Sequence, residues 1–144
     1  AGPGVTPADV LRATAYILPA LEIIDSRIAD WKIKYPDTIA DNASSGMFVV
    51  GNDPIRPERV ELRLAGMSMR KNGNVVSTGA GAACLGHPVN AVVWLANKLG
   101  EMGESIRAGD IVLSGALGPV TDIESGDVVS AEINGLGSVR ARFR

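Results

Sequence analysis

Hydrophobic and polar positions along the chain predict two α-helices. The segment Thr6–Asp9 is typical of a helix start, with a threonine that can cap the helix and a proline suited to its first turn. This helix is expected to run to about Leu18, because Pro19 cannot continue it. A second helix is predicted from Pro88 to Gly100, and the apolar residues on its buried face are Val89, Val92, Val93, Ala96 and Leu99.

The other apolar segments predict β-strands. Arg59–Leu64 alternates charged and apolar residues, which is the period of a strand with one solvated face. The pair Asn72-Gly73 is typical of a tight hairpin turn before Val75 and Val76, and Asn134-Gly135 predicts a second turn. Further strands are predicted at Ala20–Ile24, Met47–Val50, Ile111–Leu113, Val128–Ile133 and Ser138–Phe143.

Composition and charge exclude several classes of protein. The 144 residues show no internal repeat or linker and are enough for one domain, residues 1–144, with its own core. A net charge of −2 excludes a nucleic-acid partner, and no apolar run approaches the roughly 20 residues of a membrane helix. One histidine and the single Cys84 cannot build a zinc cage or an internal disulfide, so any metal must use carboxylates. A cytoplasmic location is the default expectation.

Glu22 is the first candidate for chemistry, because it interrupts the apolar strand Ala20–Ile24. A buried carboxylate loses several kcal/mol of hydration free energy unless it meets a cation or is protonated. Glu22 is therefore a candidate metal ligand or catalytic group. The alternatives are that it faces solvent at a sheet edge or pairs with Arg27.

The second candidate is the polar segment Asp41–Gly46, which lies in a predicted loop or short helix leading into the strand Met47–Val50. Its short carboxylate, amide and hydroxyl side chains are suited to orienting a carboxylate or a water molecule. An ordinary capped turn would explain the same residues.

Three other patterns favour structural roles. The glycines of Gly79–Gly81 lack the partner residues of a phosphate-binding loop, so a close backbone turn beside a small anion is favoured. Cys84 and His87 suggest a nucleophile and base, but a lone cysteine among alanines is more often a small buried apolar residue. The alternating arginines Arg140, Arg142 and Arg144 are interpreted as a solvated strand face rather than an anion site.

Several segments in order resemble one known family. They are Pro19–Arg27, the sequence ADNASSG at residues 40–46, the sequence STGAGAACLGHP at residues 77–88, Ala108–Asp110, Ser114–Leu117 and Leu136–Ser138. Together they resemble the 2-keto-4-pentenoate hydratases of the fumarylacetoacetate hydrolase superfamily, across essentially the whole chain. The resemblance implies an α+β fold, a mixed β-sheet roll with flanking helices like the C-terminal domain of that superfamily.

The resemblance implies an enzyme of aromatic meta-cleavage catabolism that adds water to 2-hydroxypenta-2,4-dienoate, giving 4-hydroxy-2-oxopentanoate. Mg²⁺ or Mn²⁺ would chelate the substrate and stabilise its enolate. By the same resemblance Glu22 is a metal ligand. The other implied site residues are Ser44, Ser45 and Asp41 as catalytic residues, and Thr78, Gly79 and Asn42 as substrate-binding residues.

The family's chains also carry a longer N-terminal part, with a Glu-x-Glu pair that supplies two further metal ligands. No Glu-x-Glu occurs in these 144 residues. Residues 1–144 are therefore expected to be one portion of a catalytic domain that binds metal weakly alone. The alternatives are a 4-oxalocrotonate decarboxylase of the same family and a non-catalytic fragment or assembly partner. A homo-oligomer, and a complex with a decarboxylase or aldolase of the same pathway, are the expected assemblies.

Overall fold

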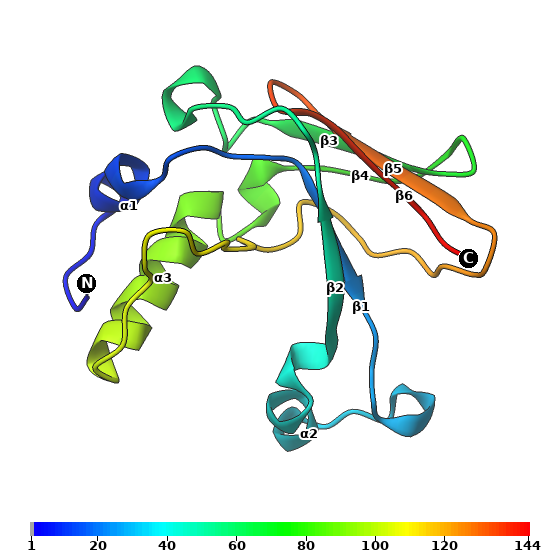
Figure 1. Cartoon of the computed structure of the whole chain (residues 1–144), viewed down its shortest axis with the longest axis horizontal. Coiled ribbons are helices and arrows are strands. Elements are labelled where there is room, and N and C mark those ends of the chain that lie inside the picture. Colours follow the sequence, from blue (N-terminus) through cyan, green and yellow to red (C-terminus); the bar gives the residue numbers. More distant parts are fainter. Residues whose placement is uncertain (1) are drawn as a thin grey trace.

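The computed structural model describes residues 2–144, which form two antiparallel β-sheets and three α-helices (Figure 1). The helices are α1 (Pro7–Ala13), α2 (Tyr35–Ala40) and α3 (Pro88–Glu101). The strands are β1 (Ala20–Ile24), β2 (Ser45–Val50), β3 (Gly66–Lys71), β4 (Asn74–Ala80), β5 (Val128–Ile133) and β6 (Gly137–Arg142). The helix-and-sheet content agrees with the expected α+β class.

The larger sheet has the strand order β4-β3-β5-β6. The β3–β4 hairpin turns at Asn72 and Gly73, whose φ angles of 51° and 87° suit the Asn-Gly turn predicted there. One face of the sheet packs inward through the buried residues Val129, Ala131, Ile133 and Val139. Because side chains alternate along a strand, the neighbouring positions of β5 and β6 face outward.

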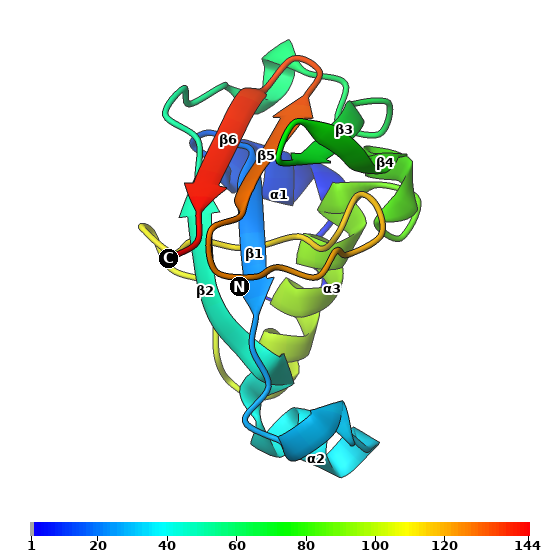
Figure 2. The same ribbon diagram turned by 90° about the vertical axis from the view of Figure 1, so that its right-hand side faces the viewer.

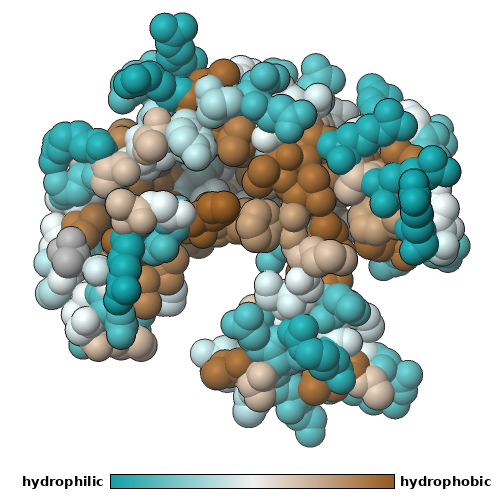
Figure 3. Space-filling model, in the orientation of Figure 1, coloured by the Kyte–Doolittle hydropathy of each residue, from teal (hydrophilic) through white to brown (hydrophobic). Residues whose placement is uncertain are grey.

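The smaller sheet pairs β1 with β2, from Ala20 opposite Val50 to Ile24 opposite Ser45, with a bulge after Ile23. Figure 1 and Figure 2 show this ribbon extending away from the larger sheet, with α2 at its far end. Met47 and Phe48 of β2 are 68% and 46% exposed. Figure 3 shows brown apolar surface on the body of the molecule near the point where the ribbon leaves it.

The core joins α1, α3 and the inner face of the larger sheet. His87 caps α3, because its Nδ1 accepts the backbone N–H of Val89 at 3.1 Å. The buried residues packed together there are Val10, Leu62, Ala65, Val89, Ile133 and Leu136. No helix within residues 2–144 is both long enough and apolar enough to span a bilayer.

The first helix is shorter than predicted. It ends at Ala13, and Thr14 has an extended backbone with ψ 115° while its Oγ1 donates to the carbonyl of Val10 at 2.8 Å. Ile17 then exchanges backbone hydrogen bonds with Ile55, at 2.7 and 3.0 Å. This pairing draws the chain out of the helix before Pro19, so the expected end at Leu18 is wrong.

Two predicted strands are wrong. Arg59–Leu64 begins in a short 3₁₀ turn, and its backbone bonds include one from Leu64 N–H to the carbonyl of Glu61 at 3.1 Å. Leu62 is buried while Leu64 is 69% exposed, so the alternating residues do not share a face. Ile111–Leu113 lies in the extended segment between α3 and β5, outside any strand. Gly100 lies inside α3, which continues to Glu101.

Candidate functional site

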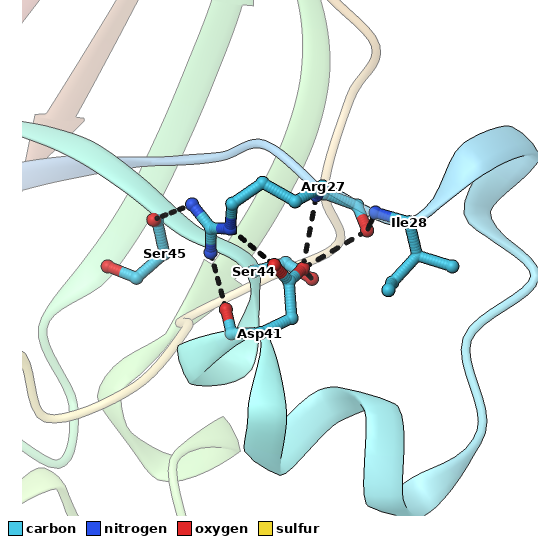
Figure 4. Close-up of polar contacts among 6 residues, drawn as sticks. Arg27, Ile28, Asp41, Ser44 and Ser45 are labelled. Atoms are coloured by element: carbon cyan, nitrogen blue, oxygen red, sulfur yellow. Dashed lines mark hydrogen bonds and ion pairs between the residues drawn. The ribbon is translucent and has the colours of Figure 1, made fainter.

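The polar segment that begins at Asp41 folds around a buried carboxylate (Figure 4). Asp41 is 6% exposed, and its Oδ2 accepts the hydroxyl of Ser44 at 2.9 Å. The hydroxyl of Ser26 and the backbone N–H of Arg27 also donate to Oδ2, each at 3.2 Å. The guanidinium of Arg27 forms an ion pair with Oδ1. Both carboxylate oxygens are therefore occupied by donors.

Arg27 ties this carboxylate to the start of β2. Its guanidinium also donates to the backbone carbonyls of Asp41 and Ser45, the latter at 3.1 Å. Burial alone would raise the pKa of Asp41, but the hydrogen bonds from Arg27 and Ser44 outweigh it and lower the pKa below its usual value. Asp41 is therefore ionised at neutral pH. Neither the sequence spacing nor any motif pointed to Arg27 as its partner.

The backbone of this segment is strained. Asn42, Ala43 and Ser44 all have positive φ angles, of 50°, 55° and 54°. Each such non-glycine residue costs of order 1 kcal/mol or more, and persists only where its surroundings hold it. The Arg27 and Ser44 bonds to Asp41 supply that hold. The strained turn presents Asn42 and Ser45 to solvent, and Figure 4 shows the Ser45 side chain pointing away from Asp41.

Glu22 is exposed on β1, opposite Phe48 of β2. The expectation of a buried carboxylate is therefore wrong, because a two-stranded ribbon leaves one side of β1 open to solvent. The possible pairing with Arg27 is also not formed, since that guanidinium is engaged by Asp41. Within the described residues Glu22 faces solvent at a sheet edge, and its role as a metal ligand stays a prediction.

The described residues do not fit a complete metal site. Within residues 2–144 no group of three His, Cys, Asp or Glu side chains is placed to hold an ion. Mg²⁺ and Mn²⁺ are coordinated by about six ligands, mostly oxygens. Glu22 alone would supply one ligand, so a metal centre would need further groups from outside these residues.

Thr78 and Gly79 lie on β4, where another segment crosses close to the strand. A Cβ placed on Gly79 would lie 1.7 Å from the carbonyl oxygen of Leu117, and one on Gly118 would lie 2.7 Å from the carbonyl of Thr78. The Ala80 N–H donates to Leu117 at 3.1 Å. This crossing, formed by Thr78–Ala80 and Leu117–Gly118, fixes the backbone of the predicted substrate-binding residues Thr78 and Gly79. In the sequence, the glycines were the only signal of this close crossing.

The structure joins some of the predicted site residues and leaves others apart. Asp41, Ser44 and, through its carbonyl, Ser45 belong to one network. No hydrogen bond or ion pair within residues 2–144 links Glu22 or Thr78 to that network. Cys84 is buried, its Sγ–H donates to the carbonyl of Ser114 at 2.7 Å, and burial raises the pKa of its thiol. This confirms the structural role expected for Cys84.

The sequence profile of the family described as fumarylacetoacetate (FAA) hydrolase C-terminal matches residues 2–144. The chain belongs to this family, which confirms the resemblance found in the sequence motifs.

Individual relatives define the similarity more narrowly. The chain is 56% identical over 138 residues to a 2-keto-4-pentenoate hydratase of Paraburkholderia xenovorans strain LB400, covering 96% of this chain and 51% of the relative. It is 49% identical over 142 residues to a 2-hydroxyhexa-2,4-dienoate hydratase of Comamonas testosteroni, covering 99% and 54%. The chain thus spans about half the length of the curated relatives that it matches.

The fold also matches a solved structure. The chain resembles 4-oxalocrotonate decarboxylase from Pseudomonas putida G7, in a complex with magnesium and adipate, with a TM-score of 0.94 and 45% identity. The match covers 99% of this chain and 54% of the decarboxylase. It confirms the α+β fold expected from the family resemblance.

Proposed function

We propose that the protein to which this chain belongs is a hydratase that adds water to 2-hydroxypenta-2,4-dienoate and forms 4-hydroxy-2-oxopentanoate. The observation that carries the proposal is the 56% identity to a 2-keto-4-pentenoate hydratase across 96% of the chain. In this proposal residues 1–144 are one portion of the catalytic domain.

The residues of this chain have distinct roles in the proposed reaction. Asp41 is a positioning residue, because its oxygens are filled by Arg27, Ser26 and Ser44 rather than free to accept a proton from substrate. It holds the strained turn that displays Asn42 and Ser45. The crossing at Thr78 and Gly79 holds the substrate carboxylate, and the rigid backbone there reduces the entropy lost on binding.

A divalent cation is part of the proposal for the whole protein, as Mg²⁺ or Mn²⁺. It is supported by the magnesium and calcium complexes of the decarboxylase that shares this fold. Of the residues in this chain, only the exposed Glu22 would contribute a ligand to the cation. The other ligands would have to come from the part of the relatives' length that this chain does not span.

The second candidate function is decarboxylation of 4-oxalocrotonate, favoured by the structural match to that decarboxylase. The two activities differ in their substrates, so separate assays with each substrate distinguish them. Full-length protein is given the dienol and, separately, oxalocrotonate. Loss of dienol absorbance with formation of the hydroxy-oxo acid supports the hydratase. Release of carbon dioxide from oxalocrotonate, with no turnover of the dienol, would replace the hydratase by the decarboxylase.

Glu22→Gln tests the role of this side chain in the full-length protein. We expect the variant to lose most of the Mg²⁺-dependent turnover of the dienol, because the neutral amide is a weaker ligand for a hard cation. Glu58→Gln is the matched control, an exposed carboxylate in the 3₁₀ turn Pro57–Arg59. Glu22 is excluded from the site if both variants keep full activity and the same Mg²⁺ dependence.

A further inference from the structure

The outward face of the larger sheet carries polar side chains from three adjacent strands. Val129, Ala131 and Val139 are buried on the inner face, so the alternate positions of β5 and β6 point outward. The strands β3, β5 and β6 lie side by side (Figure 2). The outward residues contributed by these strands are Ser68 and Arg70, Ser130 and Glu132, and Ser138 and Arg140.

The strand register places two arginines on either side of one serine. Ser130 of β5 is paired with Arg70 of β3 on one side and with Arg140 of β6 on the other. Two strand spacings separate the arginine backbones by about 10 Å. Both long side chains can therefore reach the space above Ser130 from opposite sides.

The neighbouring row of the sheet is different in charge. Glu132 is paired with Ser68 and with Ser138, which places its carboxylate one row away from the arginines. The two rows together line a surface hollow of about 520 Å³. The hollow therefore contains two guanidinium groups, three hydroxyl groups and one carboxylate.

The guanidinium groups of Arg70 and Arg140 form no ion pair within the described residues. Neither Arg70 nor Arg140 lies within 4.0 Å of a carboxylate oxygen of residues 2–144. Arg70 makes one hydrogen bond, from Nη1 to the carbonyl of Gly73 at 3.2 Å, which leaves most of its five N–H donors available. The chain as a whole has a net charge of −2, so this positive row is a local reversal of sign.

We propose that the row Arg70–Ser130–Arg140 is a binding site for a small anion with several oxygens, either a phosphate or a dicarboxylate. Two guanidinium groups that approach from opposite sides can each make charge-assisted hydrogen bonds to such an anion. The Ser130 hydroxyl lies between them as a further donor. The site is independent of the proposed hydratase function, because none of its residues belongs to the Asp41 network or to the crossing at Gly79.

Calorimetric titration of the full-length protein with inorganic phosphate, and separately with succinate, tests the site and distinguishes the two anions. We expect saturable binding of at least one of them at low ionic strength. Arg70→Ala and Arg140→Ala should each weaken it at least about tenfold, because each removes the charge-assisted hydrogen bonds of one guanidinium group. Glu132→Gln should strengthen binding by removing a nearby negative charge.

Arg12→Ala is the matched control. Arg12 is an exposed arginine of α1, the helix that packs against the inner face of the larger sheet and therefore lies on the opposite side from the proposed site. Its removal changes the net charge by the same amount and should alter affinity less than about twofold. Equal weakening by all three arginine variants would show attraction by the general field of the protein and overturn the site. Failure of both anions to bind at concentrations up to roughly 10 mM would overturn it as well.

Discussion

Replacement of Gly79 by alanine tests the close crossing between β4 and the Leu117–Gly118 segment. The added Cβ would lie 1.7 Å from the Leu117 carbonyl oxygen, which must retreat by about 1.3 Å to restore even a 3.0 Å separation. That retreat breaks the 3.1 Å hydrogen bond from Ala80 N–H to Leu117. Overpacking costs about 1–3 kcal/mol and a lost hydrogen bond about 1 kcal/mol, so we expect about 2–4 kcal/mol of destabilisation.

In the full-length protein, whose relatives are about twice as long as this chain, this loss lowers the melting temperature by roughly 4–12 °C. Thermal and urea unfolding of full-length protein, followed by circular dichroism, measure it. Gly66→Ala on β3 is the matched control, because the nearest atom to its Cβ would be Asn134 Nδ2 at an ordinary 3.5 Å. The control should change the free energy of unfolding by no more than about 0.5 kcal/mol. Equal stability of the two variants would refute the crossing.

Two further predictions concern the core and the buried carboxylate. In urea titrations, Leu62→Ala should lower the free energy of unfolding by about 2–4 kcal/mol, and Leu64→Ala by less than about 0.5 kcal/mol. Equal losses would restore the predicted strand at residues 59–64. Because the pKa of Asp41 is lower in the folded state than its ordinary value of 3.8, its contribution to stability is present above that pH and is lost as the pH falls through the folded pKa. Asp41→Asn should therefore flatten the dependence of the free energy of unfolding on pH below about pH 4. The same pH dependence in the variant and the original protein would count against the ion pair with Arg27.

The elements that the sequence predicted well are those set by local signals. The Asn72-Gly73 turn, the start and apolar face of α3, and the strand at Val128–Ile133 all depend on neighbouring residues and appear where expected. Local alternation failed at Arg59–Leu64, because the backbone there bonds to a distant segment. Ala82 N–H donates to the carbonyl of Arg63, and Gly81 N–H to that of Ala65.

The candidate site was predictable in its residue types and less so in its geometry. The segment at residues 40–46 was identified from its short polar side chains, and the structure gathers Asp41 and Ser44 there. The partner Arg27 lies 14 residues away, in the loop that follows β1, and no sequence period connects the two. The burial expected for Glu22 failed for a similar reason, because it depends on how many strands flank β1.

The crossing at Gly79 also affects how the molecule meets its neighbours. β4 is an outer strand of its sheet, and an outer strand with free N–H and carbonyl groups is a template on which another polypeptide can add. The Leu117 carbonyl accepts the hydrogen bond of the Ala80 N–H, and the Leu117–Gly118 segment passes directly against the strand. The contact that fixes the predicted substrate-binding residues therefore also protects this end of β4 from intermolecular strand pairing and aggregation.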